Sequence, residues 1–193
     1  MTRGRRTHEG KGNETLRQLR APQGTSASGD PAVANPISQF SRRLMKLGDV
    51  IAVSRTFTVA DIDEFTRITG DRGPWHVNAD ASGRKMVHGL ATAALSTVLG
   101  GAMCFMARRF ELDFLRSVHS GDTVTCTMRV TSLAEAEHRV GDRRARATRL
   151  ESTAEFVNQD GVLVAKLFAR GVIPKPLAEV LADDPASRLQ AKL

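Results

Sequence analysis

The sequence lacks the features from which several classes of protein are built. It contains no Tyr, one Trp and two Cys, Cys104 and Cys126, which is too few for a disulfide framework or a cysteine metal cluster. It has no run of about 18 apolar residues, so no stretch predicts a membrane-spanning helix. No apolar segment follows the N-terminal basic residues, so we expect no secretory signal. We therefore expect a cytoplasmic protein with reduced cysteines and no membrane partner.

The positive charge is concentrated near the N-terminus. The net charge is +7, and residues 1–46 contain nine Lys or Arg against three acids, so they carry +6 of it. An excess at one end says little about what the rest of the chain binds. Residues 1–36 are polar and have no sustained period, which predicts a disordered basic tail. The alternative is a basic arm for nucleic acid or an acidic carrier protein, but no aromatic residue interrupts these bases, so we expect no nucleic-acid partner.

From residue 47 onward the apolar pattern predicts folded elements. Residues 47–58 indicate a turn and a strand, and residues 59–70 a short helix with a capping box at its start and Gly70 as its C-cap. After a loop over 71–88, residues 90–107 are small and apolar all round, which predicts a helix buried on most faces. Two consecutive glycines, at 100 and 101, would break this helix or pack it tightly.

The remaining segments carry strand patterns. Residues 108–118, 123–137, 150–157 and 162–174 alternate or are rich in β-formers, with turn signals between them. One apolar helix among several antiparallel strands predicts an α+β fold in which a curved antiparallel sheet wraps around a central helix. Helices do not alternate with the later strands, which disfavours a parallel α/β fold. We expect the domain to span 37–176, with a helix or tail over 177–193.

The loop over 71–88 gathers side chains that can carry protons. Asp71 and His76 are five positions apart across Gly73-Pro74, and His88-Gly89 opens the apolar helix. Alone, each residue also fits a role without catalytic function, Asp71 as a turn residue and His76 as a surface histidine. Together they predict an active site, because an Asp/His pair that holds one water can supply both a base and an acid.

Three segments resemble motifs of one family. Residues 68–76, ITGDRGPWH, resemble the hydratase motif of the MaoC-like dehydratases, the (R)-specific enoyl-thioester hydratases. Residues 87–90, VHGL, resemble that family's signature at the start of its central helix, and residues 120–123, SGDT, its Gly-Asp turn. The resemblance covers roughly 47–175. Gly73 stands where the family has Asn, and the segment from His76 to His88 looks shorter than in typical hydratases.

The resemblance implies a hot-dog fold, usually as a dimer or a two-hot-dog arrangement. It implies reversible addition of water to a trans-2-enoyl thioester of CoA or a carrier protein, giving an (R)-3-hydroxyacyl thioester, without a cofactor or a metal. By position, Asp71 and His76 would be the catalytic pair, and the backbone N–H of Gly89 would bind the thioester carbonyl. Ser96 or Thr97 would support the aspartate.

Some assignments stay open at this stage. His88 fits a supporting residue at the helix start better than a catalytic one, and Trp75 is either a loop anchor or part of the acyl pocket. Two other functions also fit a hot-dog domain: an acyl-thioester-binding protein without turnover, and a thioesterase, which adds water to the carbonyl. The pair of Asp71 and His76 favours hydration.

Overall fold

A computed structural model describes residues 17–20, 46–140 and 142–182. Most of the predicted tail over 1–36, the start of the predicted domain at 37–45 and the end of the C-terminal segment lie outside these residues. Residues 17–20 form a short strand, β1 (Arg17–Arg20), although they fall within the predicted tail. The domain boundaries therefore stay a prediction.

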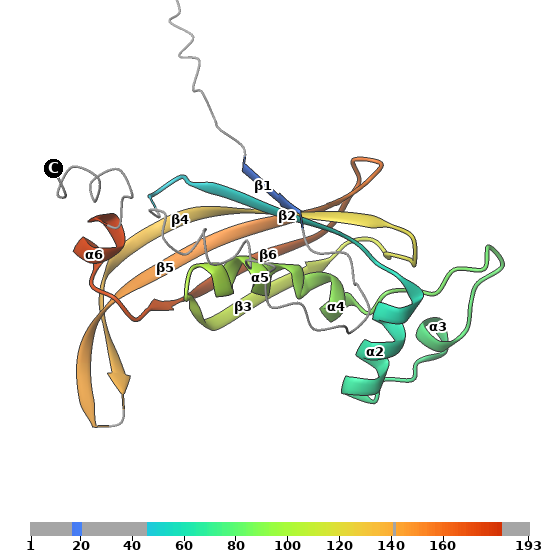
Figure 1. Cartoon of the computed structure of the whole chain (residues 1–193), viewed down its shortest axis with the longest axis horizontal. Coiled ribbons are helices and arrows are strands. Elements are labelled where there is room, and N and C mark those ends of the chain that lie inside the picture. Colours follow the sequence, from blue (N-terminus) through green and yellow to red (C-terminus); the bar gives the residue numbers. More distant parts are fainter. Residues whose placement is uncertain (1–16, 21–45, 141, 183–193) are drawn as a thin grey trace, which may run out of the picture.

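The body of the protein is a curved antiparallel sheet of five strands that bends over a helical segment (Figure 1). The order across the sheet is β2-β4-β5-β6-β3, and β1 adds a parallel pairing on the outer side of β2. This arrangement confirms the predicted α+β class and the single sheet around a helix. The five strands are β2 (Val50–Thr56), β3 (Met106–Phe114), β4 (Thr123–Val140), β5 (Arg143–Asn158) and β6 (Leu163–Ile173).

The helical segment consists of α4 (Gly89–Ala93) and α5 (Leu95–Ala102), joined by Ala94 with helical dihedral angles. Leu95 and Leu99 are buried on this segment, in one core cluster with the alternate strand residues that face it. The segment does not continue to residue 107, because the chain reverses at Cys104, whose φ is 52°, and β3 begins at Met106. It is also less buried than predicted, since a stripe of residues stays exposed. The stripe consists of Leu90, Ala94, Thr97 and Gly101.

Helix α2 (Val59–Thr69) has the predicted ends. The Asp61 N–H donates to Thr58 Oγ1 at 3.2 Å, and the Thr58 N–H donates to Asp61 Oδ2 at 2.9 Å, which confirms the capping box. Burial opposes ionisation of Asp61, but the bonds from Thr58 and Arg55 outweigh it and lower the pKa of this carboxyl. Gly70 ends the helix with a φ of 77°. These local signals fix where the chain enters the loop that follows.

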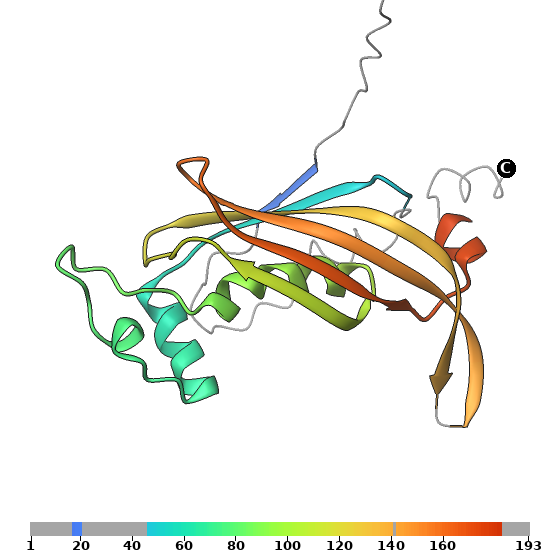
Figure 2. The same cartoon turned by 180° about the vertical axis from the view of Figure 1, so that it is seen from behind.

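Two features go beyond the predicted elements. The loop over 71–88 contains a short helix, α3 (Pro74–Val77). Strands β4 and β5 are longer than predicted, and their joined end projects beyond the rest of the sheet (Figure 2). Helix α6 (Leu177–Ala182) lies in the segment that was predicted as a helix or tail, and it packs through Val180 into a second, smaller core cluster. Among the described residues, no helix has the length and apolar character needed to cross a membrane.

Candidate functional site

Asp71 is the first residue after the left-handed C-cap of α2. Its backbone N–H donates to Thr69 Oγ1 at 3.2 Å, and its Oδ1 accepts from the N–H of Gly73 at 3.0 Å. This turn holds one carboxylate oxygen and leaves the other, Oδ2, facing two histidines. The side chain is 54% exposed, so the carboxylate is held in place but remains accessible to water.

His76 lies on α3 and faces Asp71. Its Nδ1 is 2.8 Å from the carbonyl oxygen of Met86. Because a carbonyl oxygen can only accept, Nδ1 carries the proton and Nε2 of the neutral ring keeps a lone pair. Nε2 is 3.9 Å from Asp71 Oδ2, which is too long for a direct hydrogen bond. The spacing instead suits one water that contacts both groups.

His88 completes a cluster with Asp71 and His76. Its ring stacks on that of His76, with centroids 3.7 Å apart and planes inclined by 18°. One nitrogen or oxygen atom from each of the three side chains lies within 4.8 Å of the other two, and two histidines with a carboxylate can hold a metal ion. Imidazole lone pairs lie in the ring plane, however, so stacked rings direct them side by side. The cluster as folded therefore suits proton transfer better than metal binding.

Gly73 lies between the two members of the predicted pair. A Cβ added at this position would be 3.3 Å from Asp71 Oδ1 and 3.3 Å from His76 Cδ2. Both contacts are tighter than ordinary packing. The chain therefore leaves space between the carboxylate and the imidazole at the position where its sequence departs from the hydratase motif.

A cavity of about 420 Å³ opens beside His76 and the start of α4. Gly89 lies at its wall, and the N–H groups in the first turn of a helix have no acceptor within the helix. A Cβ on Gly89 would be 3.0 Å from Phe114 Cε1, so the missing side chain lets the Phe114 ring lie against the helix start. The lining is mostly apolar, and it comprises His76, Met86, Val87, Gly89, Thr92, Phe114, Leu115, Arg116, Ser117, Val118, Val164 and Ala165.

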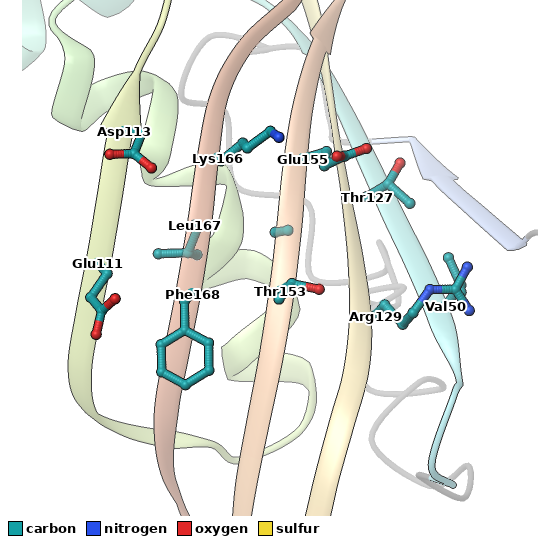
Figure 3. A pocket seen from close by; sticks show the side chains of 11 residues that line it. Val50, Glu111, Asp113, Thr127, Arg129, Thr153, Glu155, Lys166, Leu167 and Phe168 are labelled. Atoms are coloured by element: carbon teal, nitrogen blue, oxygen red, sulfur yellow. The ribbon is translucent and has the colours of Figure 1, made fainter.

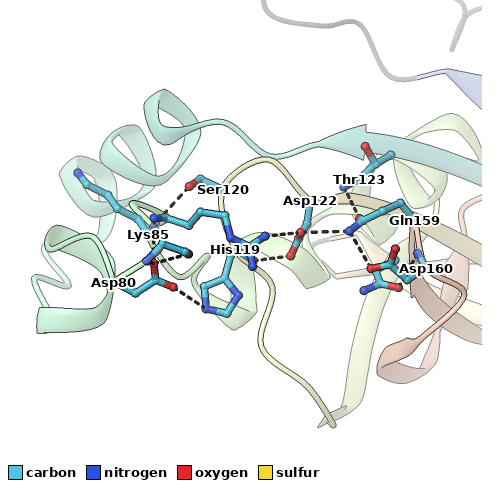
Figure 4. Close-up of polar contacts among 11 residues, drawn as sticks. Asp80, Lys85, His119, Ser120, Asp122, Thr123, Gln159 and Asp160 are labelled. Carbon is cyan, nitrogen blue, oxygen red and sulfur yellow. Dashed lines mark hydrogen bonds and ion pairs between the residues drawn. The ribbon is translucent and has the colours of Figure 1, made fainter.

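A polar network around Asp122 holds residues 84–86 in place (Figure 4). The carbonyl of Met86 in this segment accepts the hydrogen bond from His76. The buried carboxylate of Asp122 accepts from the backbone N–H of His119 at 2.8 Å, from Arg84 at 2.9 Å and from Gln159 at 3.2 Å. Met86 forms an isolated β-bridge with His119. Asp122 therefore anchors the strand-like segment whose Met86 carbonyl orients His76. In the sequence, Asp122 belongs to the hydratase-like Gly-Asp turn. That motif did not predict that this residue anchors the segment.

Asp80 secures the outer end of the same loop. Its carboxylate accepts from the Ser82 hydroxyl at 2.6 Å and from the Arg84 N–H at 3.0 Å. The Ser82 hydroxyl bond, aided by the other bonds and by His119 4.0 Å away, lowers the pKa of Asp80 to about 2. A second ion pair, between Lys85 and Asp63 at 2.8 Å, ties the loop to α2.

Three predicted residues lie away from the cluster. The Trp75 side chain is 65% exposed and is not part of the cavity lining, and its backbone carbonyl accepts from the N–H of Met86 at 3.0 Å. The hydroxyls of Ser96 and Thr97 donate to the carbonyls of Ala93 and Ala94, at the junction of α4 and α5, and therefore do not bond to Asp71. The hydroxyl residues that do line the cavity are the buried Thr92 and the exposed Ser117, which no motif had marked.

A second, larger groove crosses the opposite face of the sheet (Figure 3). Its volume is about 540 Å³. Residues that face away from the core, among them Glu111, Asp113, Glu155 and Lys166, line it. None of its lining residues is a histidine. The groove therefore lacks the acid/base pair that the cavity near α4 has.

Comparisons with known proteins agree with this architecture. A profile of the Thioesterase superfamily matches residues 85–136. An (R)-hydratase from A. caviae involved in PHA biosynthesis is 25% identical, with a TM-score of 0.55 over 66% of this chain and 96% of that one. A MaoC-like dehydratase from Rhodospirillum rubrum is 20% identical, with a TM-score of 0.55 over 69% and 96%. No curated protein matches by sequence.

RV0216 from Mycobacterium tuberculosis, which has a double hotdog fold, is also similar. It is 19% identical, with a TM-score of 0.57 over 73% of this chain and 49% of its own length. These likenesses confirm the predicted hot-dog fold. They also confirm that the chain resembles the MaoC-like hydratases.

Proposed function

We propose that this protein is a hydratase/dehydratase that adds water reversibly to a trans-2-enoyl thioester of CoA or a carrier protein. The observation that carries the proposal is the 3.9 Å approach of His76 Nε2 to Asp71 Oδ2, with His76 at the wall of the cavity that Gly89 also lines. Two proton-carrying groups that face one water next to an apolar cavity are what hydration of an enoyl thioester requires.

In the proposed reaction, Asp71 and His76 act on one water in opposite protonation states. One group takes a proton from the water as its oxygen bonds to C3, and the other gives a proton to C2, so the addition occurs on one face of the alkene. The bond from His76 Nδ1 to Met86 leaves Nε2 free to exchange a proton. The thioester stays intact, and the reverse sequence eliminates water.

The reaction places negative charge on the thioester oxygen. The Gly89 N–H, in the first turn of α4, would stabilise this charge. A positioned donor of this kind typically contributes about 10²–10³ in rate. The apolar walls of the cavity, including Phe114 and Leu115, suit an acyl chain.

We also infer that the protein works as a homodimer or a larger homo-oligomer. Strand β3 is the last strand of the sheet, and it exposes 40% of Met106, 49% of Phe110 and 51% of Phe114. An exposed edge strand with large apolar side chains is a template for pairing with another chain. The open stripe on α4 and α5 adds a second uncovered apolar surface. A second copy that pairs with β3 would cover apolar surface next to the cavity, because Phe114 belongs both to this exposed strand and to the cavity lining.

The match to the Thioesterase superfamily profile favours one alternative, hydrolysis of the thioester. In that reaction, water attacks the carbonyl and the thiol leaves. A protein that binds the thioester without turnover would give neither product.

The test is incubation with crotonyl-CoA, following both the ultraviolet absorbance of the conjugated enoyl group and thiol release. We expect loss of absorbance without thiol release. Asp71→Asn and His76→Ala should each lower the rate by about 10²–10⁴ with little change in melting temperature, whereas His138→Ala, on the projecting β4–β5 hairpin, serves as the control. Full activity in either site variant contradicts the proposal, thiol release indicates a thioesterase, and binding without turnover indicates a binding protein.

A further inference from the structure

His88 is a buried imidazole that the proposed reaction does not use. It is 4% exposed and lies between two rings, stacked on His76 and tilted against Phe65, whose centroid is 5.0 Å away at 46°. It occupies the N-cap position of α4, but its side chain makes no capping hydrogen bond. Helix capping therefore does not explain why a histidine stands here.

The contacts of His88 define its tautomer. Nε2 is 3.4 Å from the backbone oxygen of Asp71 and 3.9 Å from Asp71 Oδ2. A carbonyl oxygen can only accept, so Nε2 carries the proton. Nδ1 is then a lone pair, and it is buried without a hydrogen-bond partner among the residues that the structure describes.

This arrangement is unfavourable for a residue that only fills space. A buried polar atom without a partner costs free energy, and an apolar ring of similar size would avoid that cost. What the imidazole offers beyond volume is the Nε2–H, which points at Asp71, and a flat face against His76. Both features act on the proposed catalytic pair.

We propose that His88 is the positioning residue of this site. Its face fixes the plane of the His76 ring, and its Nε2–H places Asp71. Because the His88 carbonyl and the Gly89 N–H belong to one peptide group, the same residue ties both catalytic groups to the donor for the thioester oxygen. This inference rests on the proposed function.

Two substitutions separate the contributions of the ring and the donor. His88→Phe keeps a flat ring and removes the N–H, and His88→Gln keeps an N–H donor and removes the ring. We expect each to lower kcat by about tenfold to 10²-fold, the range that a small misplacement of reacting groups produces, with KM little changed. His138→Phe, the matched change on the hairpin, should leave both constants unchanged. A wild-type kcat in His88→Phe shows that the residue is packing alone and overturns the proposal.

A second variant pair tests whether His88 acts through Asp71. Adding His88→Phe to Asp71→Asn should lower kcat no further, because the Nε2–H acts by holding the backbone carbonyl of residue 71, and the carboxylate that this contact positions is already gone. A loss as large as in the wild-type background means that the two residues act independently, which contradicts the proposal. If instead Asp71→Asn and His76→Ala alone retain full turnover, the proposed function itself fails, and this outcome is distinct from a failure at His88.

The wild-type protein gives a test that does not depend on variants folding. Long-range nitrogen-15 NMR of the histidine rings reports which nitrogen of a neutral ring carries the proton. We expect the Nε2–H tautomer for His88 and the Nδ1–H tautomer for His76. An Nδ1–H tautomer for His88 removes the contact to Asp71 and overturns the proposal.

Discussion

Replacing Asp122 with Ala should both destabilise the protein and slow its reaction, because this buried carboxylate anchors the segment that holds His76. The change removes three acceptor contacts, those to the His119 backbone N–H, Arg84 and Gln159. It leaves the His119 N–H without its acceptor, whereas the other two donors can turn toward water.

The size of the effect follows from these contacts. A hydrogen bond to a charged group contributes about 1.5–3 kcal/mol, which applies to the His119 N–H. The Arg84 side chain is 45% exposed, so solvent screening reduces its ion pair to about 0–1 kcal/mol, and Gln159 adds little because it is exposed. We therefore expect Asp122→Ala to lower the free energy of unfolding by about 1.5–4 kcal/mol. Asp122→Asn keeps one acceptor oxygen and should cost less.

Urea unfolding at a fixed protein concentration measures this difference, and crotonyl-CoA turnover measures the effect on the site. The control is Asp113→Ala, an exposed carboxylate on the outer groove, which should stay within about 0.5 kcal/mol of wild type. We expect kcat to fall in Asp122→Ala, because the Met86 carbonyl that orients His76 loses its anchor. An unfolding free energy within 0.5 kcal/mol of wild type, or an unchanged kcat, would refute this reasoning.

Two further predictions concern the same loop. Gly73→Ala places a Cβ 3.3 Å from both Asp71 Oδ1 and His76 Cδ2, so kcat for enoyl-CoA hydration should fall while the melting temperature changes little; wild-type kcat would show that the pair tolerates the added atom. The pKa of Asp80 is lowered from 3.8 to about 2, so its stabilisation is fully present above pH 3.8 and is lost as the pH falls through about 2. Asp80→Asn should therefore be less stable than wild type at pH 5 and lose less stability on acidification; parallel pH–stability curves would contradict this.

The sequence was sufficient to predict features that depend on neighbouring residues. The capping box at Thr58 and Asp61 and the left-handed Gly70 involve contacts within a few positions, and the structure has both. Helix α3 was missed because Trp75 and His76 fit a loop as well as a helix. It is held from outside the motif by Met86, whose N–H donates to the Trp75 carbonyl and whose carbonyl accepts from the His76 ring ten positions away.

The lengths of the long strands were harder to predict for a different reason. The far ends of β4 and β5 extend past the core, and several Arg residues between 143 and 149 obscure the apolar alternation that marks a strand. Pairing of each strand with the other holds these ends. Sequence patterns report burial, and the Arg residues of this part of β5 are exposed.

In the candidate site, too, contacts between residues close in sequence were predicted, and contacts between distant segments were not. The spacing of Asp71 and His76 predicted two side chains that the structure brings within 3.9 Å. The stacking of His88 on His76 depends on how α3 and α4 meet, which no local pattern encodes. For Ser96, the carbonyl of Ala93 three positions earlier is a competing acceptor, and the hydroxyl bonds there.

The most direct test of the proposed function is to locate the oxygen that the protein adds to its substrate. A trans-2-enoyl-CoA is incubated with the protein in oxygen-18 water, and mass spectrometry determines where the label enters. We predict one heavy oxygen in the C3 hydroxyl of an intact 3-hydroxyacyl thioester. A heavy oxygen in a free carboxylate, together with released CoA, would contradict hydration and identify hydrolysis as the reaction.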